Sequence, residues 1–241
     1  MISLFRKIRQ KLLQQNRITR YLAYALGEIL LVMVGILLAL QVNNWNEYQK
    51  ERKLEQVFLK KLVKDLTDDI VLLEGIIQED SLMFIRLSQM SDDILEANDI
   101  SEVDIRDNAL FKANLFYPNK IALDNITASG QIGLIRNDSL INNLREYYRS
   151  IKIFNEGIDQ SLKNYSRDIE NFVVGFDHRR EHPSLPKKTL EEYRENPFFL
   201  NSLYFKNGLL KFQKANYQSL RKKAREIRDL AQSEIKASLN N

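Results

Sequence analysis

The sequence predicts an all-α protein in which a single N-terminal transmembrane helix continues into an elongated antiparallel helical bundle. First, the run from Leu22 to Val42 is apolar except for a few residues, and Glu28 is its only charged one. Second, apolar residues beyond this run recur at three- and four-residue steps, the period of amphipathic helices. Third, only 8 glycines and 4 prolines occur in 241 residues, and no convincing set of alternating, strand-like runs accompanies them.

The run from Leu22 to Val42 is long enough to cross a bilayer. As a helix it extends about 32 Å, and the hydrocarbon layer is about 30 Å thick. A cleavable signal peptide is the rival interpretation, but the run is long and no A-x-A cleavage site follows it. We therefore expect an uncleaved anchor at residues 21–45. Aromatic side chains at its two ends are expected to lie in the interfaces: Tyr21, Tyr24 and Trp45.

The charge of the chain is concentrated before this run. Residues 1–45 hold six of the 36 basic residues and one of the 32 acidic ones, so the remainder, with 30 and 31, is close to neutral. The positive-inside rule places segment 1–20 in the cytoplasm and segment 46–241 outside it, in the periplasm if the membrane is a bacterial inner membrane. The basic residues are expected to set this topology, and either to bind anionic lipids along an amphipathic segment or to form a disordered tail: Arg6, Lys7, Arg9, Lys11, Arg17 and Arg20.

Glu28 shares one face of the predicted helix with Gly35 and Ala39, a pair of small residues four positions apart. Such a face lets another helix approach closely, and a carboxyl group in hydrocarbon is less costly beside a partner or near water. Three interpretations stay open. Glu28 lies under the cytoplasmic headgroups, or it contacts a helix within an oligomer or complex, or it lines an ion or proton path.

Four helical segments are expected beyond the membrane. The first continues outward to about Glu96, with acidic residues such as Asp65 and Asp69 assigned to its solvent face. A short helix covers 120–128 and stops at Ser129-Gly130. A second long helix begins at the caps around Asn137 and buries Tyr147 and Tyr148. The last long helix covers 198–239, after a loop over 175–197 that holds at most a short helical piece.

The sequence offers no credible catalytic constellation and no cofactor motif. The stretch His178-Arg179-Arg180-Glu181-His182 fits the H-x-x-E-H pattern of inverted zinc peptidases. Arginines between the histidines and proline directly after them disfavour a zinc-binding helix, so we expect a solvated loop. The chain has no cysteine, which excludes disulfides and thiolate sites. The basic run 221–228 is broken by acids and is expected to be a solvated helix face, not a nucleic-acid site.

Three blocks of the sequence carry a family resemblance: FRKIRQ, GEILLVMVGILLALQVNNWNE and ASGQIGLIRNDSLINNLREYY. In this order they resemble a family of uncharacterised bacterial membrane proteins with a domain-of-unknown-function label. The resemblance covers most of the chain and is strongest over residues 4–47 and 123–148. It implies a single N-terminal span and a helical domain beyond it, and it gives no residue a role.

We therefore expect a non-enzymatic, membrane-anchored interaction or assembly protein whose helical domain binds a partner, within a homo-oligomer or a membrane-protein complex. Glu28, Gly35 and Ala39 are the expected membrane contact. The alternative is an oligomeric channel or transport component with Glu28 near the ion path. A third hypothesis is a membrane-tethered hydrolase that uses the His178 loop.

Overall fold

The protein is represented by a computed structural model that describes residues 18–105, 107–176 and 188–239. Helices are the only regular elements among these residues, so the predicted all-α class is confirmed. The chain divides into two compact units, Met1–Glu55 and Gln56–Asn241. The longest element, α2 (Ile18–Glu96), supplies the described part of the first unit and begins the second.

Helix α2 ends at the predicted residue, Glu96. Two short 3-10 turns follow, η1 (Ile100–Glu102) and η2 (Asn108–Leu110), and then residues 112–120 run without regular secondary structure. We call residues 112–120 the strap. The strap leads into the short helix α3 (Ile121–Ala128), where the sequence predicted one. Gly130 follows with φ +69°, the left-handed conformation that ends a helix at little cost for glycine.

The second long helix, α4 (Asp138–Phe176), follows the 3-10 turn η3 (Ile132–Leu134). Its start is capped as predicted, because the Asn137 side chain accepts a hydrogen bond from the Leu140 N–H at 2.9 Å. In the predicted loop region a short helix, α5 (Leu190–Arg194), begins with a capping box of Thr189 and Glu192. The last long helix, α6 (Pro197–Leu239), completes the second unit.

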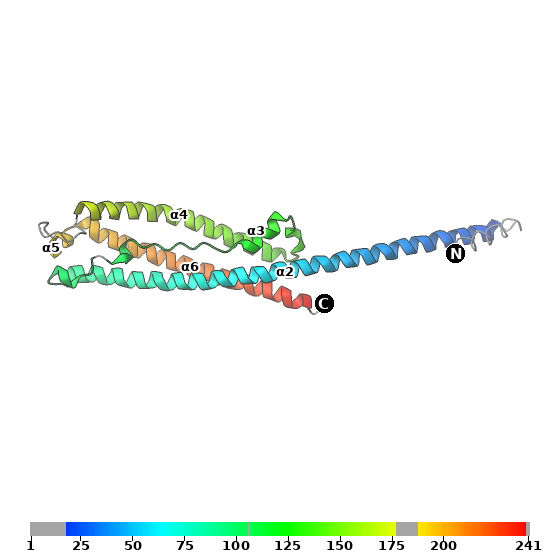
Figure 1. The fold of residues 1–241 in the computed structure, drawn as a ribbon, viewed down its shortest axis with the longest axis horizontal. Coiled ribbons are helices and arrows are strands. Elements are labelled where there is room, and N and C mark those ends of the chain that lie inside the picture. The colour runs from blue at the N-terminus through cyan, green and yellow to red at the C-terminus, as the bar shows by residue number, and fades with distance from the viewer. Residues whose placement is uncertain (1–17, 106, 177–187, 240–241) are drawn as a thin grey trace. The chain divides into compact units, whose positions relative to one another are not determined.

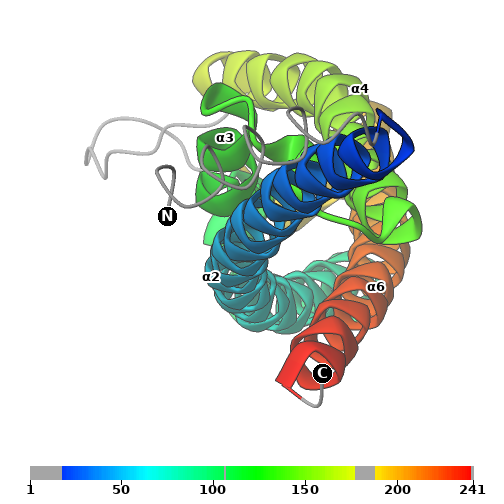
Figure 2. The ribbon, with the colours of Figure 1, turned by 90° about the vertical axis from the view of Figure 1, so that its right-hand side faces the viewer.

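The three long helices of the second unit differ in direction. Helices α4 and α6 pack together antiparallel: Phe172 lies beside Phe198 near one end, and Lys223 pairs with Glu146 near the other. Helix α6 also runs antiparallel to α2, whereas α2 and α4 run the same way (Figure 1). Helices α2 and α4 can run in the same direction because the strap returns the chain along the bundle before α4 begins. In the end-on view α3 lies beside α4 (Figure 2).

The core of the second unit consists of two hydrophobic clusters that follow each other along the bundle. The first cluster joins α2 from Phe58 to Ile77 with α3, the N-terminal part of α4 and the C-terminal part of α6. The second joins the rest of α2 to the C-terminal part of α4, to α5 and to the N-terminal part of α6. The predicted apolar stripes of α2 and α4 are buried in these clusters, apart from the partly buried Phe84 and Phe172. Burial of these stripes is the main source of stability for helices this long.

Candidate functional site

The N-terminal part of α2 is the first candidate site. Its leucine, isoleucine, valine and methionine side chains from Leu22 to Val42 are all exposed, by 44 to 73%. Within the described residues, α2 is the one helix long and apolar enough to cross a membrane, judged by length and composition. Monomeric soluble proteins rarely expose a continuous apolar surface of this size. This part of α2 therefore needs an apolar environment, supplied by lipid or by protein.

The three predicted contact residues all lie on this part of α2. Glu28, Gly35 and Ala39 are exposed, and a Cβ atom added at Gly35 would meet nothing within 4 Å. Their spacing of seven and four residues keeps them on one helical face. The structure thus leaves this face open to a second helix, and the contact itself stays a prediction.

The remaining residues predicted around the membrane are placed only in part. Tyr24 is half-buried and Trp45 is 64% exposed. Tyr21 and Arg20 belong to α2, but their side chains are outside the described set. Outside the described residues lie the other five bases, Arg6, Lys7, Arg9, Lys11 and Arg17, together with the His178 loop. Their predicted roles stay predictions.

The strap is the second candidate site, and the sequence did not indicate it. Its carbonyl groups accept hydrogen bonds from side chains of two helices, α4 and α6. From α6, the Lys206 Nζ donates to the Lys112 carbonyl at 2.9 Å, and Gln213 and Tyr217 both donate to the Asn114 carbonyl. From α4, Asn155 donates to the Phe116 carbonyl and Tyr148 to the Asn119 carbonyl, both at 2.8 Å. A partly buried segment without regular secondary structure needs such partners, because its backbone groups form no regular hydrogen-bond pattern of their own.

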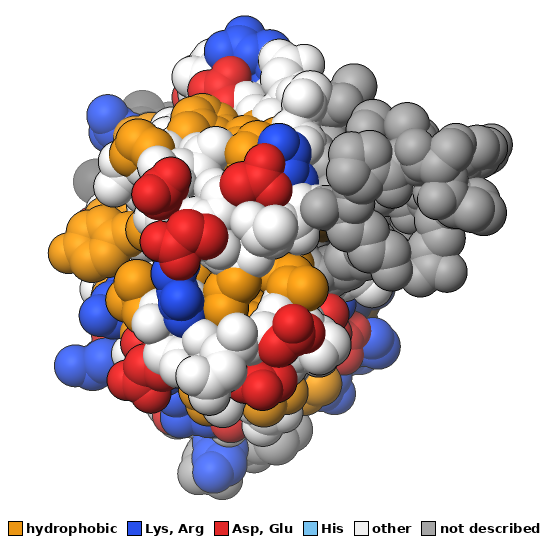
Figure 3. All heavy atoms as spheres, turned by 90° about the vertical axis from the view of Figure 1, so that its left-hand side faces the viewer, with side chains coloured by type: hydrophobic (Ala, Val, Ile, Leu, Met, Phe, Trp, Pro, Cys, Tyr) orange, Lys and Arg blue, Asp and Glu red, His pale blue; other side chains and the backbone are white. Residues whose placement is uncertain are grey.

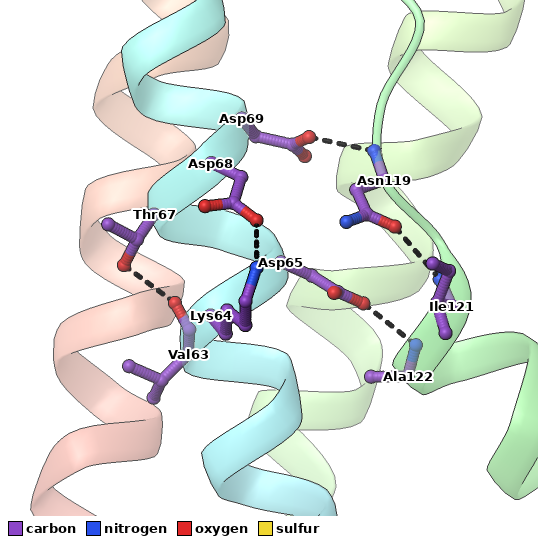
Figure 4. A network of polar contacts seen from close by, with 9 residues as sticks. All are labelled: Val63, Lys64, Asp65, Thr67, Asp68, Asp69, Asn119, Ile121 and Ala122. Carbon is purple, nitrogen blue, oxygen red and sulfur yellow. Dashed lines mark hydrogen bonds and ion pairs between the residues drawn. The ribbon is translucent and has the colours of Figure 1, made fainter.

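Helix α2 binds the end of the strap and the first turn of α3 through two carboxylates one turn apart (Figure 4). Asp69 accepts hydrogen bonds from the Asn119 N–H at 2.7 Å and from the Tyr147 hydroxyl at 3.0 Å. Asp65 accepts one from the Ala122 N–H at 2.7 Å, in the first turn of α3. Asp65 thereby caps α3 from a neighbouring helix. The assignment of Asp65 and Asp69 to the solvent face was wrong, since they are only 5% and 1% exposed.

A polar layer separates the two hydrophobic clusters at the middle of the bundle. Asp80 of α2 accepts a hydrogen bond from the Asn114 Nδ2 of the strap at 2.9 Å. Lys206 and Gln213 reach the same part of the strap from α6, and all three side chains are at most 1% exposed. Lys206 also lies 5.2 Å from the centre of the Tyr165 ring. The strap thus supplies one hydrogen-bond partner each to Asp80 of α2 and to Lys206 and Gln213 of α6.

Burial shifts the pKa of the charged groups that hold the strap. It raises the pKa of Asp69 to about 6, against the hydrogen bonds from Asn119 and Tyr147, which lower it. Burial likewise raises the pKa of Asp80 to about 6, although Asn114 and Lys206 act to lower it. Burial also raises the pKa of Asp65. It lowers the pKa of Lys206 to about 8, although the charge of Asp80 acts in the opposite direction. These carboxyl groups therefore change protonation nearer to neutral pH than carboxyl groups in water.

The sequence contains a signal for these buried polar residues. Asp69 lies seven residues after Leu62 and four before Leu73, and Asp80 lies seven after Leu73 and seven before Leu87. Both acids therefore occupy positions of the apolar stripe itself. Lys206 and Gln213 flank Leu210 in the same way on α6. A polar residue that falls at a position of the apolar stripe is expected to be buried and hydrogen-bonded. Its position in the stripe is a more specific sign of this than its residue type.

The end of the second unit where α2 finishes and α5 lies shows acidic side chains with apolar ones between them (Figure 3). Nearby, Asp93, Asp104 and Asp107 line a small cavity of about 180 Å³ together with Arg86. Arg86 lies 3.4 Å from Asp107, so part of this negative charge is balanced. Across the described ranges, no group of three or more His, Asp or Glu side chains is arranged to hold a metal ion.

The basic run of α6 pairs largely with acidic side chains. Arg221 lies 3.2 Å and Arg225 3.8 Å from Glu74 of α2, and Lys223 lies 2.9 Å from Glu146 of α4. These pairs join α6 to both neighbouring helices. At such exposed positions each contributes little to stability, about 0 to 1 kcal/mol.

Over the described ranges, the helical second unit and the exposed apolar part of α2 define a class of protein: a helical domain with one candidate membrane span. The chain belongs to DUF6090, a family of unknown function, whose model matches residues 28–177. The matched range includes the second sequence block from Glu28 onward and the whole third block, which ends at Tyr148. The basic FRKIRQ block precedes the matched range, and α6 follows it. The chain matches no curated protein and no solved structure.

Proposed function

We propose that this protein is a single-span, non-enzymatic membrane protein that assembles with other chains through its helices. The observation that carries the proposal is the uncovered apolar surface of α2 from Leu22 to Val42. In water this surface would cost roughly 25 cal/mol for each Å² exposed, which amounts to many kcal/mol over a helix of this length. Insertion into a bilayer removes that cost.

The proposed topology places segment 1–20 in the cytoplasm of a bacterium and the second unit in the periplasm. Its support is the excess of basic residues before the span. Protease added to spheroplasts of an expressing bacterium is expected to degrade the second unit and to spare a small fragment that contains the apolar run. A second unit that is degraded only after lysis would contradict this orientation.

The proposed membrane contact uses the face of Glu28, Gly35 and Ala39. Small residues let a second helix approach closely, and a partner polar group would reduce the cost of placing Glu28 in hydrocarbon. The test is the mass of the detergent-solubilised protein, measured by light scattering. Gly35→Leu is expected to weaken assembly, and Gly27→Leu, on another face, is the matched control. An unchanged mass for Gly35→Leu would reject this contact.

A channel or transport component is the second candidate, and the exposure of Glu28 within an otherwise uncharged run favours it. One span per chain would require several copies around a pore, with a ring of Glu28 carboxyl groups. This function predicts voltage-driven current in planar bilayers that changes with Glu28→Gln. The assembly function without a pore predicts no current from either protein.

A further inference from the structure

The strap runs along the bundle as an extended chain, in the manner of a β-strand. Asp69 of α2 binds the backbone of Asn119, and Asp80 of α2 binds the side chain of Asn114. The helix advances about 16.5 Å from Asp69 to Asp80, at about 1.5 Å per residue. The strap covers a similar distance between Asn114 and Asn119, so each of its residues advances about 3.3 Å, which is the rise of a strand.

The side chains of the strap alternate between the bundle core and its surface, as they do in a strand. Phe116 is fully buried, and Asn114 donates a hydrogen bond to α2. Ala113 and Tyr117 are exposed, and Leu115 between them is half-buried. One set of alternate residues thus holds the strap in the bundle, and the other set is accessible from outside.

The backbone of the strap has one edge that is paired and one that is not. The Lys112 and Asn114 carbonyls point to α6, since they accept hydrogen bonds from side chains of that helix. In a trans peptide the next N–H points the opposite way, so the Ala113 and Leu115 N–H groups point away from α6. The carbonyls of these two residues lie on the same side as their N–H groups in an extended chain. None of these four groups forms a hydrogen bond with another described residue.

A groove of about 490 Å³ opens beside this unpaired edge. Ala113, Leu115 and Tyr117 of the strap form one wall, and the C-terminal part of α4 forms the other, with the buried Leu162 as its apolar part. The strap lies between α4 and α6 (Figure 1), so the groove is on the side to which the unpaired groups point. Its volume falls within the range of ligand sites, about 300 to 1,000 Å³.

The charges around the groove are balanced. Two acidic and two basic side chains of α4 line it, namely Asp159, Lys163, Arg167 and Glu170. Lys163 and Asp159 pair with each other at 2.5 Å. A groove of this kind does not select an ion. Its unpaired backbone groups fit a neutral ligand that carries N–H donors and C=O acceptors at the spacing of a strand.

We propose that this groove binds an extended, uncharged segment of a partner protein, which adds to the strap as a neighbouring strand. The segment exchanges hydrogen bonds with the backbones of Ala113 and Leu115, and every second side chain of the segment faces the apolar surface around Leu162. The strap of a second copy is not the occupant, because its own unpaired edge is recessed beside α4 in the same way. The inference goes beyond the proposed assembly through helices and does not depend on it.

The test uses the full chain in detergent and a neutral probe peptide, acetyl-Ser-Thr-Val-Thr-Val-Thr-Ser-amide. Hydrogen exchange resolved to single amides follows the strap, and a fluorescent copy of the peptide gives the affinity. We expect the Ala113 and Leu115 amides to exchange fast in the free protein and at least about fivefold more slowly with saturating peptide. Slow exchange of both amides in the free protein, or no saturable binding of the peptide, overturns the proposal.

Two matched controls separate backbone pairing from other binding. Ala113→Pro removes one N–H and places a ring on the pairing edge, so it is expected to weaken binding by about tenfold or more. Ala113→Gly keeps the N–H and is expected to bind as the wild type does, and circular dichroism checks that both variants fold. The probe peptide with N-methylated valine and threonine amides is expected not to bind.

The N-methylated peptide keeps the proposal falsifiable if Ala113→Pro does not fold, because it is tested on the wild-type chain. Equal binding of the methylated and parent peptides, or equal affinity of a folded Ala113→Pro variant and the wild type, overturns the proposal.

A further measurement distinguishes the occupants of the groove. Exchange at Ala113 and Leu115 that slows with protein concentration alone would indicate that a second copy pairs with the strap, and this result also overturns the proposal. The membrane contact fails separately: an unchanged mass for Gly35→Leu counts against that contact and leaves peptide binding as it is.

Discussion

Asp69 connects three segments of the second unit through one side chain. It belongs to α2, and its two oxygens bind the Asn119 N–H of the strap and the Tyr147 hydroxyl of α4. Tyr147 is fully buried, and burial together with the neighbouring Asp69 raises its pKa, so its hydroxyl keeps its proton and donates at any ordinary pH. These two donors reduce the free-energy cost of burying the Asp69 carboxylate.

Tyr147→Phe is therefore expected to lower the free energy of unfolding by about 1 to 1.5 kcal/mol, the usual contribution of one hydrogen bond, or somewhat more because Asp69 stays buried. Urea unfolding followed by circular dichroism measures the loss. In an Asp69→Ala background the same substitution should cost clearly less, because its partner is gone. Equal losses in both backgrounds would show that the hydroxyl does not act through Asp69.

The raised pKa values of Asp69 and Asp80 predict an unusual pH dependence. The ordinary value is 3.8 and the folded value about 6 for both, so the folded state binds these protons more tightly than the unfolded state. Their contribution to stability is complete below pH 3.8 and is lost as pH rises through 6. Between pH 7 and pH 5 we expect the free energy of unfolding to rise by about 1 kcal/mol for each group.

The measurement for this pH dependence is urea unfolding at pH 7 and pH 5. The double variant Asp69→Asn, Asp80→Asn should flatten the difference. Lys206 does not interfere, because its lowered pKa of about 8 affects stability only at higher pH. A wild-type protein that is less stable at pH 5 than at pH 7 would contradict the assignment.

At the scale of elements, the strap contacts all three long helices of the second unit. It lies between the long helices (Figure 1), and Phe116 places a fully buried ring against Tyr217 of α6, with ring centres 6.4 Å apart. Its carbonyl groups meanwhile satisfy donors from α4 and α6. The strap is thus a packed segment of the bundle, beside the three long helices, although it has no regular secondary structure.

Truncation of two neighbouring residues of the strap should change the free energy of unfolding by very different amounts. Phe116→Ala is expected to lower the free energy of unfolding by about 3 to 5 kcal/mol through loss of buried area and a cavity. Tyr117→Ala, one position on and 68% exposed, should change it by less than about 0.5 kcal/mol. Thermal unfolding of both variants checks the contrast. Similar losses would mean that the strap is not oriented as described.

At the scale of the whole molecule, the helices were predictable and the strap was not. The end of α2 at Glu96, the cap at Asn137 and the stop at Gly130 are local signals, and all three predictions were confirmed. The path of the strap depends on contacts with residues 29 to 103 positions away, which no local pattern encodes. Asp69 was misassigned for a different reason, because its position in phase with the apolar stripe was not taken as a sign of burial. The predicted contact face of Glu28 rests on residue spacing alone and stays a prediction.

The division of α2 into an exposed apolar part and a core-facing part gives a final prediction. Leu31 and Val71 are comparably exposed, by 73 and 67%, yet only Leu31 lies in the apolar run. If that run is in the bilayer, Leu31→Lys should oppose membrane insertion by about 2.5 to 3.5 kcal/mol near the centre of the span, and Val71→Lys should have no effect on it. The measurement is the fraction of protein that resists alkaline extraction from membranes. Equal extraction of both variants and the wild type would mean that the exposed apolar surface is covered by protein, because a partner helix tolerates a peripheral lysine that hydrocarbon does not.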